Sequence, residues 1–320
     1  MCFGATYYID ATNGNVSNTG LSPEYPWKTI AQVNSKSFSP GDSILFKKGE
    51  TWRETLTVPS SGSADNVITF GAYGTGAKPI ISGSNLIKAG WSKDSQNIWK
   101  STVTTQPTIV YFNGERGTLV AAKANITSEF KWFWASNVLY VWAPSGITPS
   151  AYYINPGIEA GDRNQAIRTN DKSYVIVDGI TARDGNENNG ATVNVGSVSV
   201  TGIVFQNCVI ERGAHTGIGL KGSTTAASVT IDHCTIQNNG GWGIWFDQTY
   251  TTATVSNSII TGNGWASAAD DQQYGGIQGY LGNVNIYSNT IYDNVLGTAN
   301  ATNESHGIYT LVDIAIANIY

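Results

Sequence analysis

The chain carries little charge, and its few basic residues do not cluster. Of 320 residues, 18 are Lys or Arg and 23 are Asp or Glu, which gives a net charge of −5. A nucleic-acid-binding surface needs clustered Lys and Arg, and this sequence has no such cluster. No apolar run is long enough to cross a bilayer. The sequence therefore predicts neither a nucleic-acid partner nor a membrane span.

Cysteine and methionine are also scarce. Cys2, Cys208 and Cys234 are too few for a disulfide framework, and Met1 is the only methionine. The letters "CFGA" before Thr6 resemble the end of a secretory signal, although vector-derived residues would look similar. We expect residues 1–5 to be a signal remnant or vector residues, and the protein to be secreted or held at the surface of a bacterial cell.

Glycine is abundant, with 36 residues, and the second half of the chain repeats. The segments "GIVFQNCVIERGAHTGIGLK", "SVTIDHCTIQNNGGWGIWFD" and "NVNIYSNTIYDN" share alternating apolar positions, a polar position, a turn and a later Gly-Ile. The first apolar position recurs every 24 to 31 residues, at Val175, Ile203, Val229, Ala253 and Val284. This period is too short for a propeller blade and lacks the leucine pattern of a horseshoe.

Such a repeat predicts a solenoid in which each turn contains about three short strands, paired in parallel at roughly 4.8 Å. Equivalent residues then stack in interior columns. The polar position is expected to hold a ladder of buried side chains that bond neighbouring turns, a structural role that extends to the histidine. Its members are Asn207, His233, Asn257 and Ser288. Cys208 and Cys234 follow directly, and we expect neighbouring buried thiols rather than a disulfide.

These repeats resemble those of the secreted right-handed parallel β-helix proteins, the architecture of pectate lyases and related polysaccharide lyases, epimerases and hydrolases. The opening segment "YYIDATNGNVSNTGLSPEYPWKTIAQVN" resembles the entry segment of bacterial members, in which a short helix plugs the first turn. Pro26 could open that helix, with Trp27, Ile30 and Ala31 on one side. The resemblance implies an all-β, right-handed parallel β-helix, with an N-terminal cap and first coils over 6–87 and regular coils over 156–320.

Residues 88–155 interrupt the repeat. Their strand-like runs alternate aromatic and polar residues, which predicts an inserted region of antiparallel hairpins on the side of the solenoid. Trp132, Trp134, Tyr140 and Trp142 are either a platform for sugar rings or, as in most insertions, ordinary core aromatics.

The alternation after each Gly-Ile predicts an outward-facing strip. If Ile244 and Phe246 point inward, Trp245 and Asp247 point out. Aromatic faces stack on sugar rings, while amides and charges bind hydroxyls and carboxylates, so the strip suits an extended saccharide. The candidate substrate-binding residues are Trp242, Trp245, Gln278, Tyr280 and Tyr309.

Two longer loops, between Ile260 and Ile277 and between Ile291 and Ile308, are expected to form a wall beside this strip. Lyase or epimerase chemistry on uronic acids needs a cation for the substrate carboxylate and a base near C5. The candidate catalytic residues are Lys221, Asp247, Arg212, His215 and His306, and the candidate calcium ligands are Asp270 and Asp271. A hydrolase would instead pair Asp247 with Asp270 or Asp271. An ordinary surface ion pair between Lys221 and Asp247 is the simplest alternative.

No catalytic motif of a pectate lyase, polygalacturonase or epimerase matches this chain. The sequence therefore predicts an extracellular, polysaccharide-active β-helix with lyase-type cleavage of an acidic polysaccharide, and calcium as its only candidate cofactor. A glycoside hydrolase and a non-catalytic carbohydrate-binding or adhesive surface protein remain the alternatives.

The last residues, "DIAIANIY", begin another repeat, with Ile314, Ile316 and Asn318 at the first, second and polar positions. An exposed parallel edge favours aggregation unless it is covered. We expect either a fragment of a longer protein or an oligomer whose partner covers this edge.

Overall fold

The computed structural model describes residues 4–187, 190–196, 200–220, 228–247, 252–266, 275–280, 284–294, 306–310 and 318–319. In the last two ranges the backbone is described throughout, but side chains are described only for residues 307 and 308. Among the described residues, no helix is both long and apolar enough to cross a membrane.

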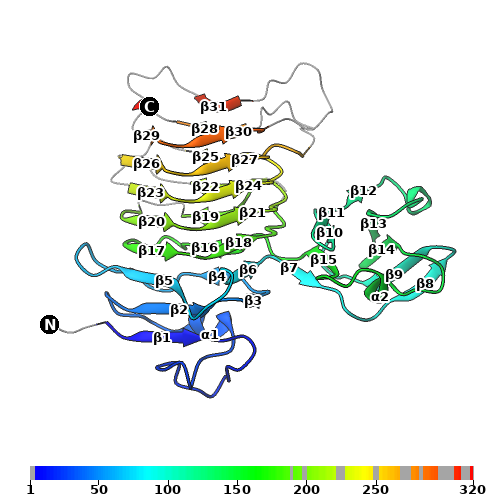
Figure 1. Ribbon diagram of the computed structural model, residues 1–320, viewed down its shortest axis with the longest axis horizontal. Coiled ribbons are helices and arrows are strands. Elements are labelled where there is room, and N and C mark those ends of the chain that lie inside the picture. Colours follow the sequence, from blue (N-terminus) through cyan, green and yellow to red (C-terminus); the bar gives the residue numbers. More distant parts are fainter. Residues whose placement is uncertain are drawn as a thin grey trace.

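Three parallel sheets run along a solenoid, and each complete turn contributes one strand to each sheet (Figure 1). Sheet 1 contains β1 (Thr6–Ile9), β2 (Ser43–Lys47), β5 (Ile68–Tyr73), β17 (Val175–Asp178), β20 (Ile203–Gln206), β23 (Ser228–Asp232), β26 (Thr252–Ser256), β29 (Val284–Tyr287) and β32 (Asn318–Ile319). Sheet 2 contains β3 (Thr51–Trp52), β6 (Ile80–Ser82), β18 (Thr181–Arg183), β21 (Val209–Glu211), β24 (Thr235–Gln237), β27 (Ile259–Thr261) and β30 (Thr290–Tyr292). Sheet 3 contains β4 (Leu56–Thr57), β16 (Ile167–Arg168), β19 (Ala191–Val195), β22 (Thr216–Leu220), β25 (Ile244–Phe246), β28 (Gly275–Gly279) and β31 (His306–Thr310). The predicted fold class, a parallel β-helix, is confirmed.

The interior columns follow the predicted register. Ile203 pairs with Val229, Val229 with Ala253, and Ala253 with Val284, and all four side chains are buried. Because the inward positions of the strands are mostly apolar, successive turns bury one continuous core.

The polar position between sheets 1 and 2 differs from the prediction. Asn207, His233 and Asn257 are exposed, and their φ angles of 50° to 52° place them in the left-handed region that a tight turn requires. Asn207 Nδ2 still donates to Asp178 Oδ1 of the preceding turn, at 2.8 Å. The expected burial of this column is wrong, because the residues form the outside of a bend.

The buried ladder lies instead at the bend between sheets 2 and 3. Asn239, Asn263 and Asn294 stack there, and each is at least 93% buried. Asn239 Nδ2 donates to Asn263 Oδ1 at 3.0 Å, and Asn263 Nδ2 donates to Asn294 Oδ1 at 2.9 Å. The amides therefore satisfy one another and the bent backbone.

Two further predictions concern the cysteines and the last strand. Cys208 and Cys234 are buried free thiols, as expected. β32 pairs Ile319 with Ile286 of β29, so the predicted alignment of Ile316 with Ile286 is wrong by three residues. Any partner at this edge would meet residues that are mostly outside the described ranges.

A short helix covers the first turn, as the resemblance implied, but it begins later than Pro26. α1 (Ile30–Ser35) starts after Thr29, whose hydroxyl accepts from the backbone of Gln32 at 3.3 Å. The Gln32 side chain accepts in return from the backbone of Thr29, which completes a capping box. Ile30 is fully buried and anchors the helix on the core.

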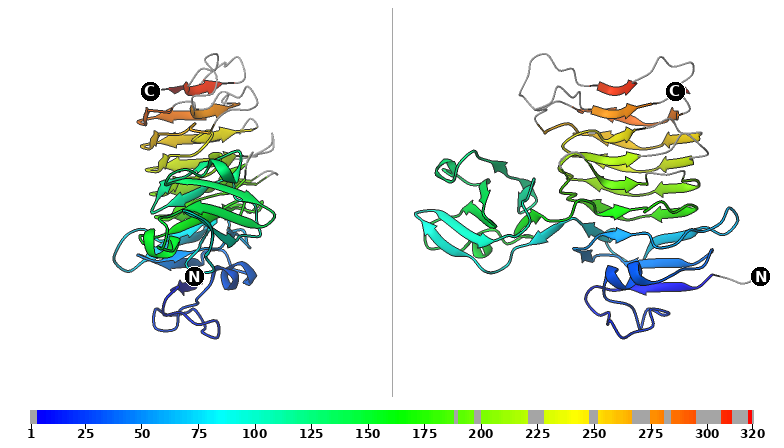
Figure 2. Two further views of the ribbon diagram at one scale, coloured as in Figure 1. Left: turned by 90° about the vertical axis from the view of Figure 1, so that its right-hand side faces the viewer. Right: turned by 180° about the vertical axis from the view of Figure 1, so that it is seen from behind.

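The inserted region projects from one side of the solenoid (Figure 2). Its larger sheet contains β12 (Thr118–Leu119), β13 (Lys131–Ala135), β14 (Val138–Trp142), β9 (Ile98–Thr102) and β8 (Ser92–Ser95). Its smaller sheet contains β11 (Glu115–Arg116), β10 (Val110–Phe112), β15 (Ile158–Gly161) and β7 (Ser84–Leu86), and the region also holds α2 (Pro149–Tyr152) and a 3-10 turn, η1 (Lys123–Asn125). The antiparallel subregion is thus confirmed, and its strands extend beyond residues 88–155. Trp132 is buried in a separate core, while Trp134, Tyr140 and Trp142 are partly buried.

Candidate functional site

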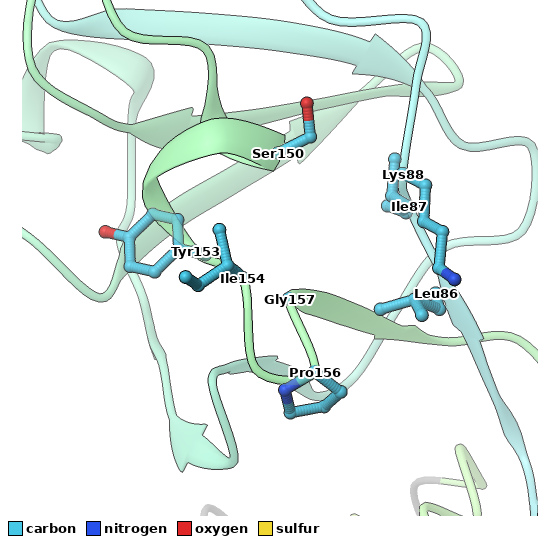
Figure 3. A pocket seen from close by; sticks show the side chains of 8 residues that line it. All are labelled: Leu86, Ile87, Lys88, Ser150, Tyr153, Ile154, Pro156 and Gly157. Carbon is cyan, nitrogen blue, oxygen red and sulfur yellow. The ribbon is translucent and has the colours of Figure 1, made fainter.

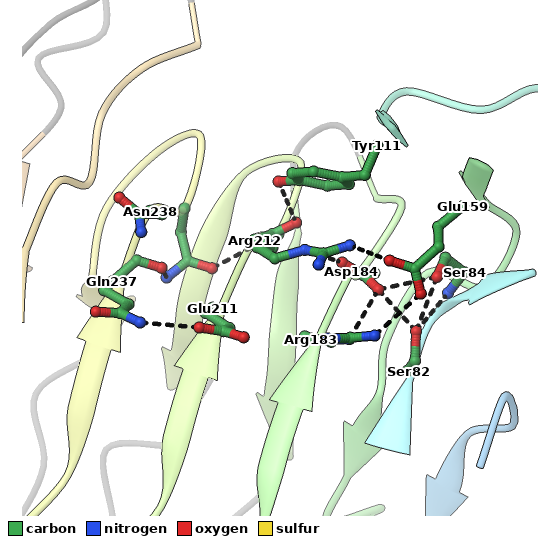
Figure 4. Close-up of polar contacts among 12 residues, drawn as sticks. Ser82, Ser84, Tyr111, Glu159, Arg183, Asp184, Glu211, Arg212, Gln237 and Asn238 are labelled. Carbon is green, nitrogen blue, oxygen red and sulfur yellow. Dashed lines mark hydrogen bonds and ion pairs between the residues drawn. The ribbon is translucent and has the colours of Figure 1, made fainter. Parts of the chain in front are cut away.

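A buried ion cluster joins the insertion to the solenoid (Figure 4). Glu159, on β15 of the insertion, is fully buried. Its carboxylate accepts from Arg53 Nη2 at 2.6 Å, Arg183 Nη2 at 3.0 Å and Arg212 Nη2 at 2.6 Å, three arginines of the solenoid. Burial acts to raise the pKa of Glu159, but the charges of the arginines outweigh it and lower the pKa to about 2.

Asp184 is the second buried acid of this cluster. Its Oδ1 lies 2.9 Å from Arg212 Nε, and its Oδ2 accepts from Ser82 at 2.8 Å and from Ser84 at 2.9 Å. Burial acts to lower the pKa of Arg212, but Asp184 and Glu159 together raise it above its ordinary value. Arg212 is therefore a fixed cation whose guanidinium is occupied on two sides.

A hairpin of the insertion packs against the solenoid next to this ion cluster. β10 and β11 are joined by Asn113 and Gly114, both at positive φ, as a two-residue hairpin turn requires. Tyr111 on β10 stacks on the Arg212 guanidinium at 3.9 Å and donates its hydroxyl to the Arg212 carbonyl at 3.1 Å. On β11 the insertion instead supplies the cation and the solenoid supplies the aromatic ring.

There, the guanidinium of Arg116 lies 3.8 Å from the ring centre of Trp265, which belongs to the solenoid. Trp265 Nε1 donates to the Asn238 carbonyl at 2.9 Å, which fixes the indole. Two cation–π contacts thus hold the hairpin against the solenoid, and the cation comes from the solenoid in one and from the insertion in the other.

A groove with two compartments lies between the insertion and the solenoid. The polar compartment has a volume of about 350 Å³ and is lined by Tyr111, Gly114, Glu115, Arg116, Glu211, Arg212, Asn238, Gly262 and Trp265. The apolar compartment has a volume of about 430 Å³ and is lined by Thr108, Ile109, Arg116, Gly117, Thr118, Leu119, Trp132, Trp265 and Ala266. Arg116 and Trp265 line both, so the compartments adjoin at this pair.

Each wall of the polar compartment carries one carboxylate that is outside the ion cluster. Glu115 comes from the insertion and is exposed, and Glu211 comes from the end of β21 and is partly buried. Gln237 Nε2, one turn away, donates to Glu211 Oε2 at 2.8 Å and orients it. Two carboxylates, a stacked aromatic ring and fixed cations can bind sugar hydroxyls and transfer protons between them.

The outward strip on sheet 3 has the predicted register. Trp245 pairs with Gln278, and each is partly buried between two buried residues of its strand. Asp247 and Tyr280 are also partly buried, and each directly follows the buried last residue of a strand. This is the alternation that the sequence predicts. The strip lies on a different sheet from β21, which carries Glu211.

Other candidate residues are placed away from this strip. Arg212 belongs to the ion cluster at the end of sheet 2. His215 is 6% exposed, and its Nδ1 lies 3.0 Å from the hydroxyl of Thr216. Burial lowers the pKa of His215, against the opposing effects of the Gly190 backbone and the charge of Glu187. Trp242 is 2% exposed, so its indole offers little surface for stacking.

Several predicted residues lie outside the described part of the chain. These are Lys221, Asp270 and Asp271, while His306 and Tyr309 are described only as backbone positions of β31. Among the described residues, no group of three or more His, Cys, Asp or Glu side chains could hold a metal ion.

Four residues that line the groove were not among those predicted from the sequence, namely Glu115, Arg116, Glu211 and Trp265. One signal was present, because Trp265 lies in the first of the two long loops that were expected to form a wall. Glu211 could have been found by applying the outward alternation to the second strand of each turn. No pattern in the sequence indicated Glu115 or Arg116, because they line the groove only when the insertion packs against the solenoid.

A third cavity, of about 320 Å³, lies within the insertion near its connection to the solenoid (Figure 3). It is lined by Leu86, Ile87, Lys88, Ser150, Tyr153, Ile154, Pro156 and Gly157. No carboxylate lines it, which distinguishes it from the polar compartment of the groove.

Comparisons with known proteins agree with this architecture. The family model described as right handed beta helix region matches residues 91–264, more than half of the chain. A lacto-N-biosidase of Bifidobacterium longum subsp. longum is 33% identical over 97 residues, a match that covers 28% of this chain and 6% of that protein. The chain thus corresponds to a small part of that curated relative.

Solved structures show the same fold. A structure of XylC in complex with xylose superposes with a TM-score of 0.72 at 16% identity, covering 91% of this chain and 59% of that one. A structure named as a glycoside hydrolase superposes with a TM-score of 0.62 at 11% identity, covering 96% of this chain and 85% of the other.

Proposed function

The chain belongs to the right-handed β-helix family, and from that premise we propose that it is a carbohydrate-active protein that binds a saccharide in the groove beside the insertion and hydrolyses it. The observation that carries this proposal is the polar compartment, in which Glu115 and Glu211 approach from two walls next to Trp265.

The compartment suits a sugar ring for three reasons. Trp265 offers an aromatic surface fixed by its bond to the Asn238 carbonyl, and such surfaces stack on the apolar faces of sugars. Asn238 and Arg116 supply polar groups for hydroxyls. The volume of about 350 Å³ lies within the range of roughly 300–1,000 Å³ that is usual for ligand pockets.

Glycoside hydrolysis needs two carboxyl groups, one to protonate the departing oxygen and one to attack the sugar or activate water. Glu115 and Glu211 are the pair that the groove offers, and Gln237 keeps one oxygen of Glu211 in place. The names of the relatives support hydrolysis, because one is a lacto-N-biosidase and another a glycoside hydrolase.

Elimination on an acidic polysaccharide, the chemistry predicted from the sequence, would use the outward strip with Lys221 and Asp247. That site remains a competing proposal, and calcium dependence belongs to it. The action of the protein on polysaccharides outside a bacterial cell is likewise part of our proposal.

One assay separates these reactions. The wild-type protein is incubated with xylo-oligosaccharides, N-acetylated oligosaccharides, pectate, alginate and glycosaminoglycans, with calcium or with chelator. We expect new reducing ends without the ultraviolet absorbance of unsaturated uronides.

Substitutions in the groove and on the outward strip show which of the two surfaces carries out the reaction. Glu211→Gln and Glu115→Gln are each expected to lower kcat by about 10²- to 10⁴-fold, the usual contribution of a catalytic acid or base. Asp247→Asn is the matched control and should leave turnover within about twofold of the wild type. Unsaturated products that disappear in Asp247→Asn but persist in Glu211→Gln would contradict the proposal.

A further inference from the structure

The apolar compartment adjoins the polar one but has no carboxylate among its lining residues. Its apolar lining residues are Leu119, Ile109, Ala266, Trp132 and Trp265, of which Ile109 and Trp132 are almost fully buried. Leu119 is 56% exposed and is the most solvent-exposed of these apolar residues. Sugar hydroxyls placed against the aliphatic part of this surface would lose their hydrogen bonds to water without gaining new ones.

Trp132 adds a polar feature to this wall. Within the described part of the chain, its Nε1 is buried and has no hydrogen-bond partner, whereas Trp134 Nε1 donates to the Val103 carbonyl at 2.7 Å. A buried donor without an acceptor costs about 1–3 kcal/mol. Trp99 Nε1 is also buried and unpaired, but Trp99 does not line the groove.

Trp132, which carries the unpaired donor, is one of the residues that line the compartment. Cδ1 of Trp132, which is bonded to Nε1, would be 2.9 Å from a Cβ atom built on Gly117, and Gly117 lines the compartment. Leu119 is the register partner of Trp132 in the β12–β13 pair. The side chains of Leu119 and Trp132 are therefore neighbours on one face of the β12–β13 pair.

We propose that the apolar compartment binds an acyl ester carried by the sugar, with its apolar part against Leu119 and Ile109 and its carbonyl oxygen accepting from Trp132 Nε1. This inference rests on the proposed function for the position of the sugar. The shared Arg116–Trp265 pair places the ester next to the sugar ring. The substrate class is then an acylated saccharide rather than an unsubstituted one.

The test uses probes without sugar, so that it is independent of glycan cleavage. Methyl benzoate carries an ester carbonyl on an apolar ring, and anisole is its counterpart without the carbonyl. Each is titrated into ¹⁵N-labelled full-length protein while the indole N–H signals are recorded. The signals of Trp132 and Trp99 are assigned with Trp132→Phe and Trp99→Phe.

We expect methyl benzoate to shift the Trp132 signal in a saturable manner, to leave Trp99 unchanged, and to bind at least fivefold more tightly than anisole. Leu119→Asp should weaken its binding at least tenfold. Leu21→Asp is the matched control, since Leu21 is also 56% exposed but lies in an N-terminal loop.

No shift of Trp132 up to the solubility limit, equal shifts of Trp132 and Trp99, or equal binding of anisole would each overturn the inference. Because neither probe contains a glycosidic bond, glycan cleavage without probe binding would overturn only this inference. Probe binding without glycan cleavage would overturn only the proposed function.

Discussion

Two surfaces of this protein can be compared as saccharide sites, the groove beside the insertion and the outward strip on sheet 3. The strip arises from repetition, because Trp245 and Gln278 occupy the same register position in successive turns. The groove arises from docking, because Glu115 and Glu211 are 96 residues apart by subtraction and meet only where the insertion contacts the solenoid. A repeat can supply a row of similar groups, whereas docking encloses different groups in one cavity.

The surfaces also differ in how they are held. Four residues that line the groove are fixed by ion pairs or by stacking, namely Tyr111, Arg116, Arg212 and Trp265. The groove shares Arg212 with the buried cluster around Glu159 (Figure 4). In a preorganised polar site of this kind, binding and reaction do not require an additional free-energy cost to order the side chains. The following experiments test this difference.

Removal of the central acid should have the largest effect. Glu159→Gln leaves Arg53, Arg183 and Arg212, which are all partly buried, with only Asp184 as a buried anion, and loss of one partner of a buried ion pair costs about 3–5 kcal/mol. Urea unfolding measures the free energy. Glu24→Gln, at an exposed position, is the control and should change stability by less than about 0.5 kcal/mol. Equal stability of the two variants would show that the cluster does not hold the insertion.

The same cluster predicts a dependence on pH. The pKa of Glu159 falls from 4.5 to about 2 on folding. The contribution of its ionisation to the free energy of unfolding is therefore complete above pH 4.5 and is lost as the pH decreases toward 2. A shift of this size corresponds to roughly 3 kcal/mol. Unfolding free energies of wild type and Glu159→Gln should therefore converge on acidification. A constant difference between the two proteins across this range would refute the assignment.

Aromatic stacking gives a smaller effect. Trp265→Ala should weaken binding of the cleaved glycan by about tenfold, since an aromatic contact contributes roughly 0.5–1.5 kcal/mol. Trp245→Ala on the strip should change the dissociation constant by less than about twofold. Calorimetric titration of both variants compares the two surfaces directly, and the reverse ranking would move the site to the strip.

The smallest effect is expected on the strip itself. Asp247 is partly buried, and its backbone N–H donates to the Leu220 carbonyl, a bond that Asn would retain. Asp247→Asn should keep stability within about 0.5 kcal/mol of the wild type. Thermal unfolding would detect a larger loss, which would indicate that Asp247 has a partner of its own.

Local periodicity predicted the solenoid, the inward columns and the orientation of Trp245, because these depend only on alternation within a strand. It misplaced the ladder, since an asparagine after a strand can be the exposed left-handed residue of a bend, as Asn207 is, or a buried stacking amide, as Asn263 is. The groove could not be predicted, because Glu159 and Arg212 meet through tertiary contacts that no repeat encodes.

The most direct test of the groove is a crystal structure of Glu211→Gln with the saccharide that the wild-type protein cleaves. The account predicts a sugar ring stacked on Trp265, with Glu115 and the substituted position 211 on either side of one glycosidic oxygen. A saccharide bound along Trp245 and Gln278, with an empty groove, would contradict it.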